Sequence, residues 1–150
     1  MTPNDIKNFI CETVQKLGIL VTEVEIKDIY GMTTYNVATP EANLLIGKDG
    51  NNLKSFNLIF NQMLTKKAGE KLHVNIDVNG YREKALHNLR SEASRIAEEV
   101  RKTKKPVPLA PMSSFDRMVI HSMFAEDIQI ETISEGEGEE RKVVISYRVI

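Results

Sequence analysis

Two glycines bracket two charged residues in Gly47-Lys48-Asp49-Gly50, the first segment of the sequence with a potential for ligand chemistry. The apolar run 43–46 enters this segment, and a stretch with helical periodicity, which includes Lys54, leaves it. Glycine lets a backbone approach a ligand with no Cβ atom in between, and the amides at the start of a helix favour a phosphate. The four loop residues and Lys54 are therefore candidate phosphate-binding residues, although many such tetrapeptides are only turns. If both glycines lie in an exposed turn, replacing either should leave the domain folded.

A second candidate pair is Arg117 and His121, which stand four positions apart and so share one face of a helix. Arginine offers a planar fork for a phosphate or a stacking plane for a base, and histidine can donate a hydrogen bond without being charged. The alternative is an ordinary pair of surface residues or a local hydrogen-bonded pair. Spacing alone does not decide between these interpretations.

The sequence has no constellation typical of an enzyme. It contains no nucleophile elbow, P-loop or HExxH motif, and its one cysteine, Cys11, permits neither an internal disulfide nor a thiolate metal cluster. Asp116, His121, Glu126 and Asp127 cluster in sequence as a metal-dependent nuclease site could, but Asp116 and His121 are five apart and point in different directions on a helix. We therefore predict no catalytic residue, no metal and no cofactor.

The charge of the chain is unevenly distributed, although its formal net value is only −1. Residues 41–105 carry 13 Lys and Arg against 8 Asp and Glu, whereas residues 106–150 carry 4 against 8. The basic segment includes the glycine loop and ends in the run 101–105. A local basic patch attracts a phosphate backbone, while a solvated helix face is the plainer interpretation.

Length and composition limit the class of protein. At 150 residues, 41% hydrophobic and 27% charged, the chain fits one ordinary domain or two small ones. No apolar stretch approaches the roughly 18 residues that span a bilayer, and the first residues lack the features of a secretory signal. We predict a cytoplasmic protein without a membrane span.

The elements that must position these residues follow from periodicity and from turn residues. Residues 4–17 predict a helix, 21–30 and 33–39 paired strands, and the segment after the loop a helix that ends near residue 68, followed by a strand over 72–78. A long helix should occupy about 81–104, and the proline-rich stretch 106–111 must run extended. Ser113 with Asp116 predicts the start of another helix, and 128–133 with 142–150 a hairpin. The fold class is thus α+β.

The order of these elements and the two motifs resemble a known family. Helix, strand, strand, helical turn, Gly-x-x-Gly, helix and strand is the arrangement of a type II KH domain, whose GXXG loop clamps single-stranded RNA. Arg-x-x-x-His after a long helix and an extended proline stretch resembles the R-3-H domain, an α/β module associated with single-stranded nucleic acids. Both domains in this order resemble the bacterial Jag family, the SpoIIIJ-associated proteins, also called KhpB or EloR.

The resemblance implies a fold, a function and partners. It implies two small α/β-sandwich domains, a KH domain over 1–79 and an R-3-H domain over 80–150. It implies single-stranded RNA as the ligand, with single-stranded DNA as a second candidate, and a role in post-transcriptional regulation linked to the cell envelope or division. Ile46, Gly47, Lys48, Asp49, Gly50 and Lys54 would bind RNA in the first domain, and Arg117 and His121 in the second. A second small KH protein, or self-association, is the protein partner that it implies.

The sequence departs from the family pattern in two ways. Many Jag proteins carry a further N-terminal Jag domain, which we expect to be absent because this sequence begins at the KH-like segment. The loop pair is Lys48-Asp49, and the carboxylate should repel a phosphate unless it caps the next helix. Asp49 and the acidic last third leave a second hypothesis open, in which both folds serve as a protein-interaction scaffold with weak or no RNA binding.

Overall fold

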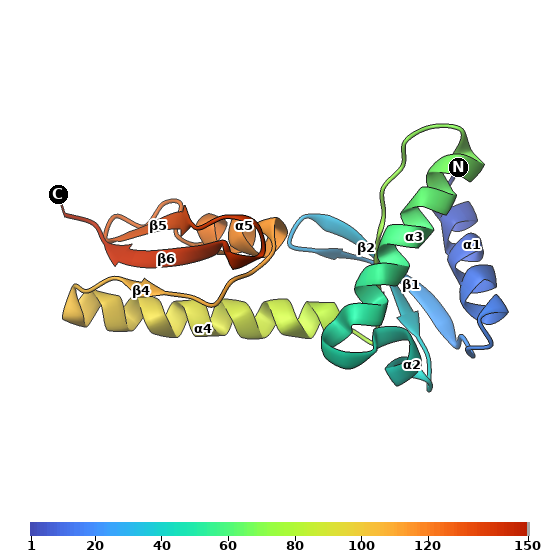
Figure 1. Ribbon diagram of the computed structural model, residues 1–150, viewed down its shortest axis with the longest axis horizontal. Helices are drawn as coiled ribbons and strands as arrows, with labels where there is room; N and C mark the ends of the chain where they lie inside the picture. The colour runs from blue at the N-terminus through green and yellow to red at the C-terminus, as the bar shows by residue number, and fades with distance from the viewer. Residues whose placement is uncertain (150) are drawn as a thin grey trace. The chain divides into compact units, whose positions relative to one another are not determined.

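Residues 1–149 are described by a computed structural model, which has the mixed helix and strand content expected from the sequence (Figure 1). The chain forms two compact units, Met1–Lys84 and Ala85–Ile150. Helix α4 (Tyr81–Thr103) begins in the first unit and continues in the second. The prediction of two small α+β units is confirmed, and the domain boundary between residues 79 and 80 stays a prediction.

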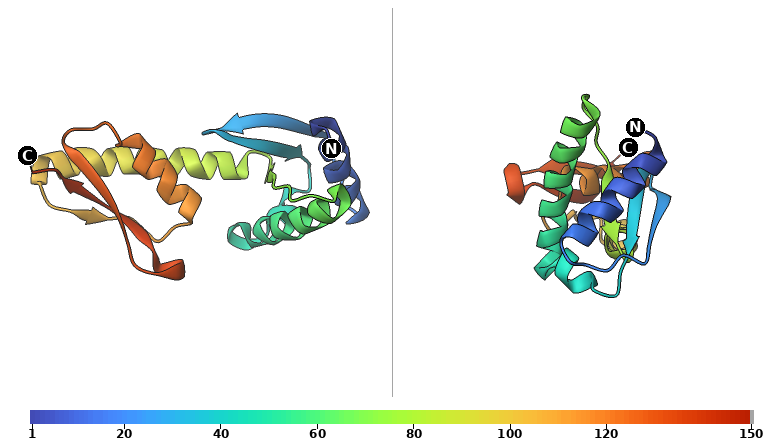
Figure 2. Two further views of the ribbon diagram at one scale, coloured as in Figure 1. Left: turned by 90° about the horizontal axis from the view of Figure 1, so that it is seen from above. Right: turned by 90° about the vertical axis from the view of Figure 1, so that its right-hand side faces the viewer.

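The first unit has the element order that the sequence predicts. Its elements are α1 (Pro3–Lys16), β1 (Glu23–Ile29), β2 (Met32–Ala38), α2 (Ala42–Ile46), the 3-10 turn η1 (Lys48–Gly50), α3 (Asn51–Ala68) and β3 (Asn75–Val78). Strand β2 is central, antiparallel to β1 and parallel to β3. Helices α1 and α3 lie side by side (Figure 2), and the ring centroids of Phe9 and Phe60 are 5.0 Å apart. The apolar stripes of both helices meet the inward strand residues in one core.

Helix α3 is fastened to the outer edge of β3 by three polar side chains, Asn57, Asn61 and Thr65, which lie on one helix face because they are four apart. Each both donates to and accepts from the backbone of one residue, at 2.7–3.3 Å, and these residues are Ile76, Val74 and Leu72 in turn. The edge of the sheet is thereby satisfied by a helix instead of a strand. The predicted strand over 72–78 is correspondingly shorter, because pairing with β2 begins only at Asn75.

The start of α4 depends on a buried carboxylate. Asp77 is 0% exposed and accepts hydrogen bonds from the backbone N–H groups of Arg82 and Glu83 at 2.8 and 3.0 Å. These are two of the helix N–H groups that have no partner within the helix. Asp77 alternates with the apolar residues Ile76 and Val78 along β3, yet it is buried and anchors the helix that follows.

The second unit packs the rest of α4 and helix α5 (Ser114–Met123) on a small sheet of β4 (Val107–Pro108), β5 (Ile130–Glu135) and β6 (Lys142–Tyr147), with a 3-10 turn, η2 (Gly138–Glu140), before β6. Strand β6 is central and antiparallel to both neighbours. The proline-rich stretch is extended as predicted, and its pairing with β6 through Val107 was not foreseen. The apolar stripe of α4 closes the core against Ile120, Ile130 and Ile145.

Within residues 1–149, no helix is both long and apolar enough to cross a membrane. The same part of the chain contains no group of three or more His, Cys, Asp and Glu side chains that could hold a metal ion.

Candidate nucleic-acid interface

The glycine loop is a tight turn between α2 and α3 whose backbone demands glycine. Gly47 has φ 71° and ψ −174°, a region essentially open to glycine alone, and a Cβ atom there would lie 2.4 Å from Cγ of Asn52. Gly50 has φ 76°, and its Cβ would lie 2.9 Å from Cε1 of Tyr81. Both glycines are half-buried, not in a fully exposed turn, so we expect a substitution at either one to disturb the fold.

The two variable loop residues, Lys48 and Asp49, are both exposed. Asp49 has φ 55° and ψ 26°, in the left-handed region, where Asp and Asn are tolerated better than most residues. The residue that caps α3 is Gly50, with no side-chain hydrogen bond, so helix capping does not explain the acid. Its backbone conformation is one that Asp tolerates, and Asp49 directly precedes the N-cap residue of the 18-residue helix α3.

The remaining residues predicted for this loop differ in their surroundings. Lys54 is exposed on the first turns of α3. Ile46 is half-buried and packs against the core of the first unit, so it anchors the N-terminal end of the loop to that core.

The second predicted pair lies on α5, in the second unit. Ser113 caps the helix by accepting from the N–H of Asp116 at 3.3 Å, as its spacing predicted. The guanidinium of Arg117 donates from Nη1 to the carbonyl of Met112 at 2.8 Å and from Nη2 to the hydroxyl of Ser114 at 3.4 Å. A backbone carbonyl therefore fixes the direction of this guanidinium.

His121 has hydrogen-bond partners at both ring nitrogens. Nδ1 is 2.7 Å from the hydroxyl of Thr132, and Nε2 is 2.8 Å from the hydroxyl of Ser134. Burial, with smaller contributions from Arg117 and Arg141, lowers the pKa of His121 below its ordinary value. The imidazole is therefore neutral at neutral pH.

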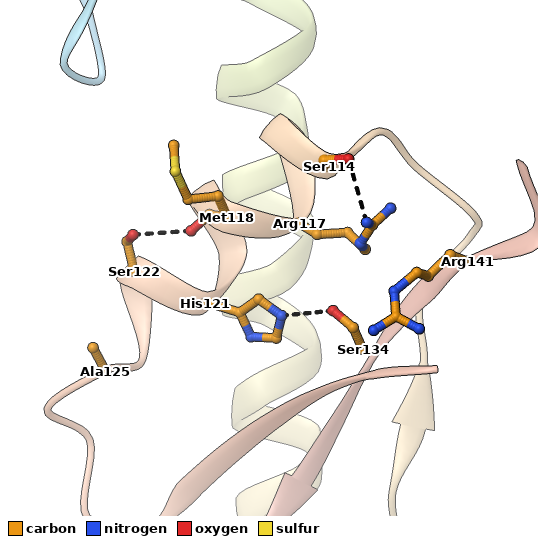
Figure 3. Close-up of a pocket in the computed structure, with 8 residues that line it drawn as sticks. All are labelled: Ser114, Arg117, Met118, His121, Ser122, Ala125, Ser134 and Arg141. Carbon is orange, nitrogen blue, oxygen red and sulfur yellow. Dashed lines mark hydrogen bonds between the residues drawn. The ribbon is translucent and has the colours of Figure 1, made fainter. Parts of the chain in front are cut away.

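Arg117 and His121 line an open pocket of about 420 Å³ together with Arg141 and Ser134 (Figure 3). Arg141, just before β6, donates to the carbonyl of Gly136 at 2.7 Å. Within residues 1–149, no carboxylate forms an ion pair with Arg117 or Arg141. Two oriented guanidiniums thus converge on one hollow without an anion to neutralise them, and such a hollow suits a phosphate.

Sequence reasoning missed Arg141, Ser134 and Thr132 as site residues. Period-two alternation could place Thr132 and Ser134 on one face of a strand. Only the pairing of β5 with β6, and the packing of α5 on them, brings these residues to Arg117. A lone arginine after an acidic loop carries no signal of its own.

The basic run 101–105 at the end of α4 is less free to bind a phosphate than its charge suggests, because two of its side chains are already engaged within the chain. Arg101 forms an ion pair with Asp127 and also donates to Gln129 at 2.8 Å. This pairing lowers the pKa of Asp127 to about 2. Lys104 lies over the ring of Tyr147, 3.7 Å from its centroid. Asp127, one member of the imagined nuclease cluster, is therefore engaged in a structural contact.

Comparison with known proteins places these features in a family. Residues 87–147 match the family model of the R-3-H domain. Over 129 residues the chain is 34% identical to the RNA-binding protein KhpB of Bacillus subtilis strain 168, an alignment that covers 85% of this chain and 62% of that protein. It is 33% identical over 113 residues to the RNA-binding protein KhpB of Clostridium symbiosum (75% of this chain, 51% of that protein). The corresponding protein of Lactiplantibacillus plantarum is 32% identical over 142 residues (94% and 44%).

The chain thus spans between 44% and 62% of the length of these relatives. The family model confirms the R-3-H domain that the second motif indicated, and the relatives agree with the family that both motifs indicated. The chain carries an R-3-H domain in its second unit, and over 75–94% of its length it is similar to the KhpB proteins of the Jag family.

Proposed function

We propose that this chain binds single-stranded RNA without catalysing a reaction, and that it uses the pocket of Arg117 and Arg141 as one phosphate-binding site. The observation that carries the proposal is the pair of guanidiniums, each held by a backbone carbonyl and neither paired with a carboxylate among the described residues. Arginine forks bind phosphate oxygens in pairs, and sites oriented in advance lose little entropy on binding. The names of the KhpB relatives support RNA as the source of the phosphate. Single-stranded DNA offers the same phosphate chemistry and is the second candidate ligand.

The glycine loop is the second site of this proposal. The N–H groups at the start of α3 and the exposed Lys48 and Lys54 would contact the backbone of the strand, while Asp49 weakens that contact. Because both sites belong to one chain, a strand long enough to reach both gains from effective concentration, whereas a short strand does not. We place this activity in the cytoplasm, in post-transcriptional regulation.

The proposal is tested by the salt dependence of binding to fluorescently labelled single-stranded RNA, followed by anisotropy at 50 and 200 mM salt. Each phosphate contact contributes about 0.7 to the slope of log affinity against log salt concentration. We expect Arg117→Gln and Arg141→Gln each to make this slope shallower by about 0.7, since each variant loses one phosphate contact. Arg148→Gln is the matched control, because it removes the same charge from the opposite end of β6. Equal slopes in all four proteins would refute the pocket as an RNA site.

A protein-binding role has one specific observation in its favour. Helix α3 exposes three apolar side chains, Leu58 at 64%, Ile59 at 56% and Met63 at 39%. Such a patch is typical of an interaction site. We propose that it binds a second copy of this chain or a second small KH protein. Light scattering of the parent and of Ile59→Ser tests this: a dimer in the parent and a monomer in the variant support it, and a monomeric parent that also fails to bind an added KH protein contradicts it.

A further inference from the structure

His121 is placed in the pocket in a way that leaves neither nitrogen for a ligand. Its Nδ1 and Nε2 atoms lie 2.7 and 2.8 Å from the hydroxyls of Thr132 and Ser134. These two residues are two positions apart on β5 and so lie on one face of the strand. Ser134 in turn lines the pocket between His121 and the two arginines (Figure 3).

A neutral imidazole has one donor and one acceptor, so the two hydroxyls must play opposite parts. With the proton on Nε2, the ring donates to the Ser134 oxygen, and the hydrogen of that hydroxyl is free to point into the pocket. Thr132 then donates to Nδ1. With the proton on Nδ1, Ser134 must spend its hydrogen on Nε2, and it presents only lone pairs to the pocket. The first arrangement attracts an anion, and the second repels it.

We propose that His121 is a positioning residue: it turns the Ser134 hydroxyl into a donor toward a phosphate held by Arg117 and Arg141, and it does not touch the phosphate itself. The inference rests on the proposed function of this pocket. It adds Ser134 as a contact, gives Thr132 the task of holding the Nε2–H tautomer, and removes His121 from the set of direct RNA contacts.

Four variants separate action through Ser134 from direct contact, with labelled single-stranded RNA as the probe. Loss of one hydrogen bond to a charged group should weaken binding about tenfold, so Ser134→Ala and His121→Ala should each do this. The double variant should be no weaker than either single variant, because both changes remove the same bond. Ser146→Ala is the matched serine control, since Ser146 is not among the residues that line this pocket and its hydroxyl donates to the carbonyl of Glu131 at 3.4 Å. It should bind as the parent does.

Rescue by a side chain of the right length adds a readout that a merely structural role would not change. A glutamine amide reaches about as far as Nε2, whereas an asparagine amide reaches only as far as Nδ1. His121→Gln should therefore retain most of the affinity and His121→Asn should lose it. In the parent chain saturated with the same RNA, ¹⁵N spectra of the imidazole should show the proton on Nε2.

The outcomes distinguish this inference from the proposed function. If the losses of Ser134→Ala and His121→Ala add in the double variant, His121 contacts RNA directly and the inference is wrong. It is also wrong if Ser134→Ala binds normally or if the bound state carries the proton on Nδ1. If Arg117→Gln and Arg141→Gln bind RNA normally as well, the proposed function fails with it; if they lose binding, only the role of His121 and Ser134 is overturned.

Discussion

Asp49→Asn isolates the electrostatic cost of the acid in the glycine loop. Asp49 occupies the left-handed region, which asparagine also tolerates, so the substitution removes the charge and leaves the backbone undisturbed. Asp49 is exposed, so a water-like dielectric applies to its repulsion of a phosphate. At about 6 Å, two unit charges in water repel by about 0.7 kcal/mol. The expected gain in RNA affinity is therefore about threefold at low salt, and smaller at high salt, where repulsion is screened.

Asp49→Lys reverses the charge but forces lysine into the left-handed region, at a cost of about 1 kcal/mol. This strain is a cost of folding that is present with and without RNA, so the electrostatic gain of about 1.4 kcal/mol should raise the RNA affinity about tenfold. The salt slope separates the two variants, since only the lysine adds a phosphate contact, worth about 0.7.

The assay for both variants is anisotropy with labelled single-stranded RNA at two salt concentrations. Asp28→Asn is the control, because it removes an exposed acid from β1 of the same unit. Equal gains in Asp28→Asn and Asp49→Asn would mean that only net charge matters. An unchanged or lower affinity in Asp49→Asn would refute the assignment of the loop as a phosphate contact.

Three further predictions concern stability, each measured by urea denaturation. Gly47→Ala should lower the free energy of unfolding by at least about 2 kcal/mol, because it adds backbone strain and a collision with Asn52. Gly31→Ala is the control: Gly31 has φ 84° but open space around it, so the free energy of unfolding should fall by only about 1 kcal/mol. Equal losses in the two variants would argue against the collision. Asn61→Leu should lower the free energy of unfolding by about 2–4 kcal/mol, because it leaves the N–H and C=O of Val74 unpaired. Gln62→Leu, a change at the exposed neighbouring residue, should alter it by no more than about 0.5 kcal/mol. A loss below about 1 kcal/mol in Asn61→Leu would show that water replaces the amide. Arg101 lowers the pKa of Asp127 to about 2, below its ordinary pKa near 4. The ionised carboxylate therefore stabilises the folded state by about 1 kcal/mol above pH 4, and this stabilisation should be lost as the pH falls from 4 to 2. Asp127→Asn should remove that part of the pH dependence, and an identical pH profile in parent and variant would contradict the assignment.

The sequence predicts elements well where one signal dominates. The periodic apolar residues of α4 and the stop at the prolines predicted that helix to within one residue at its end. Sequence-based prediction fails where side chains from a distant part of the sequence, and not the backbone of a neighbouring strand, form the hydrogen bonds of a segment. The segment 72–74 alternates as a strand does, but Asn61 and Thr65 of α3 take up its backbone groups, and no periodicity reveals that exchange.

The candidate site shows the same division. Arg117 and His121 were found because their spacing, which puts them on one helix face, also matches the Arg-x-x-x-His motif of the R-3-H domain. Arg141 and Ser134 reach the pocket only through the hairpin and its packing on α5, which are long-range contacts. The sequence showed the charge of Asp49 but not its left-handed backbone, a conformation that Asp tolerates better than most residues.

The most direct test of the central claim is a titration of the ¹⁵N-labelled chain with single-stranded RNA, followed by NMR at the backbone amides and the arginine Nε–H groups. The account predicts shifts at Gly47 to Asn52 and at the Nε–H groups of Arg117 and Arg141, with little change at Arg148. RNA-dependent shifts confined to other surfaces, or no shift at either arginine of the pocket under saturating RNA, would contradict it.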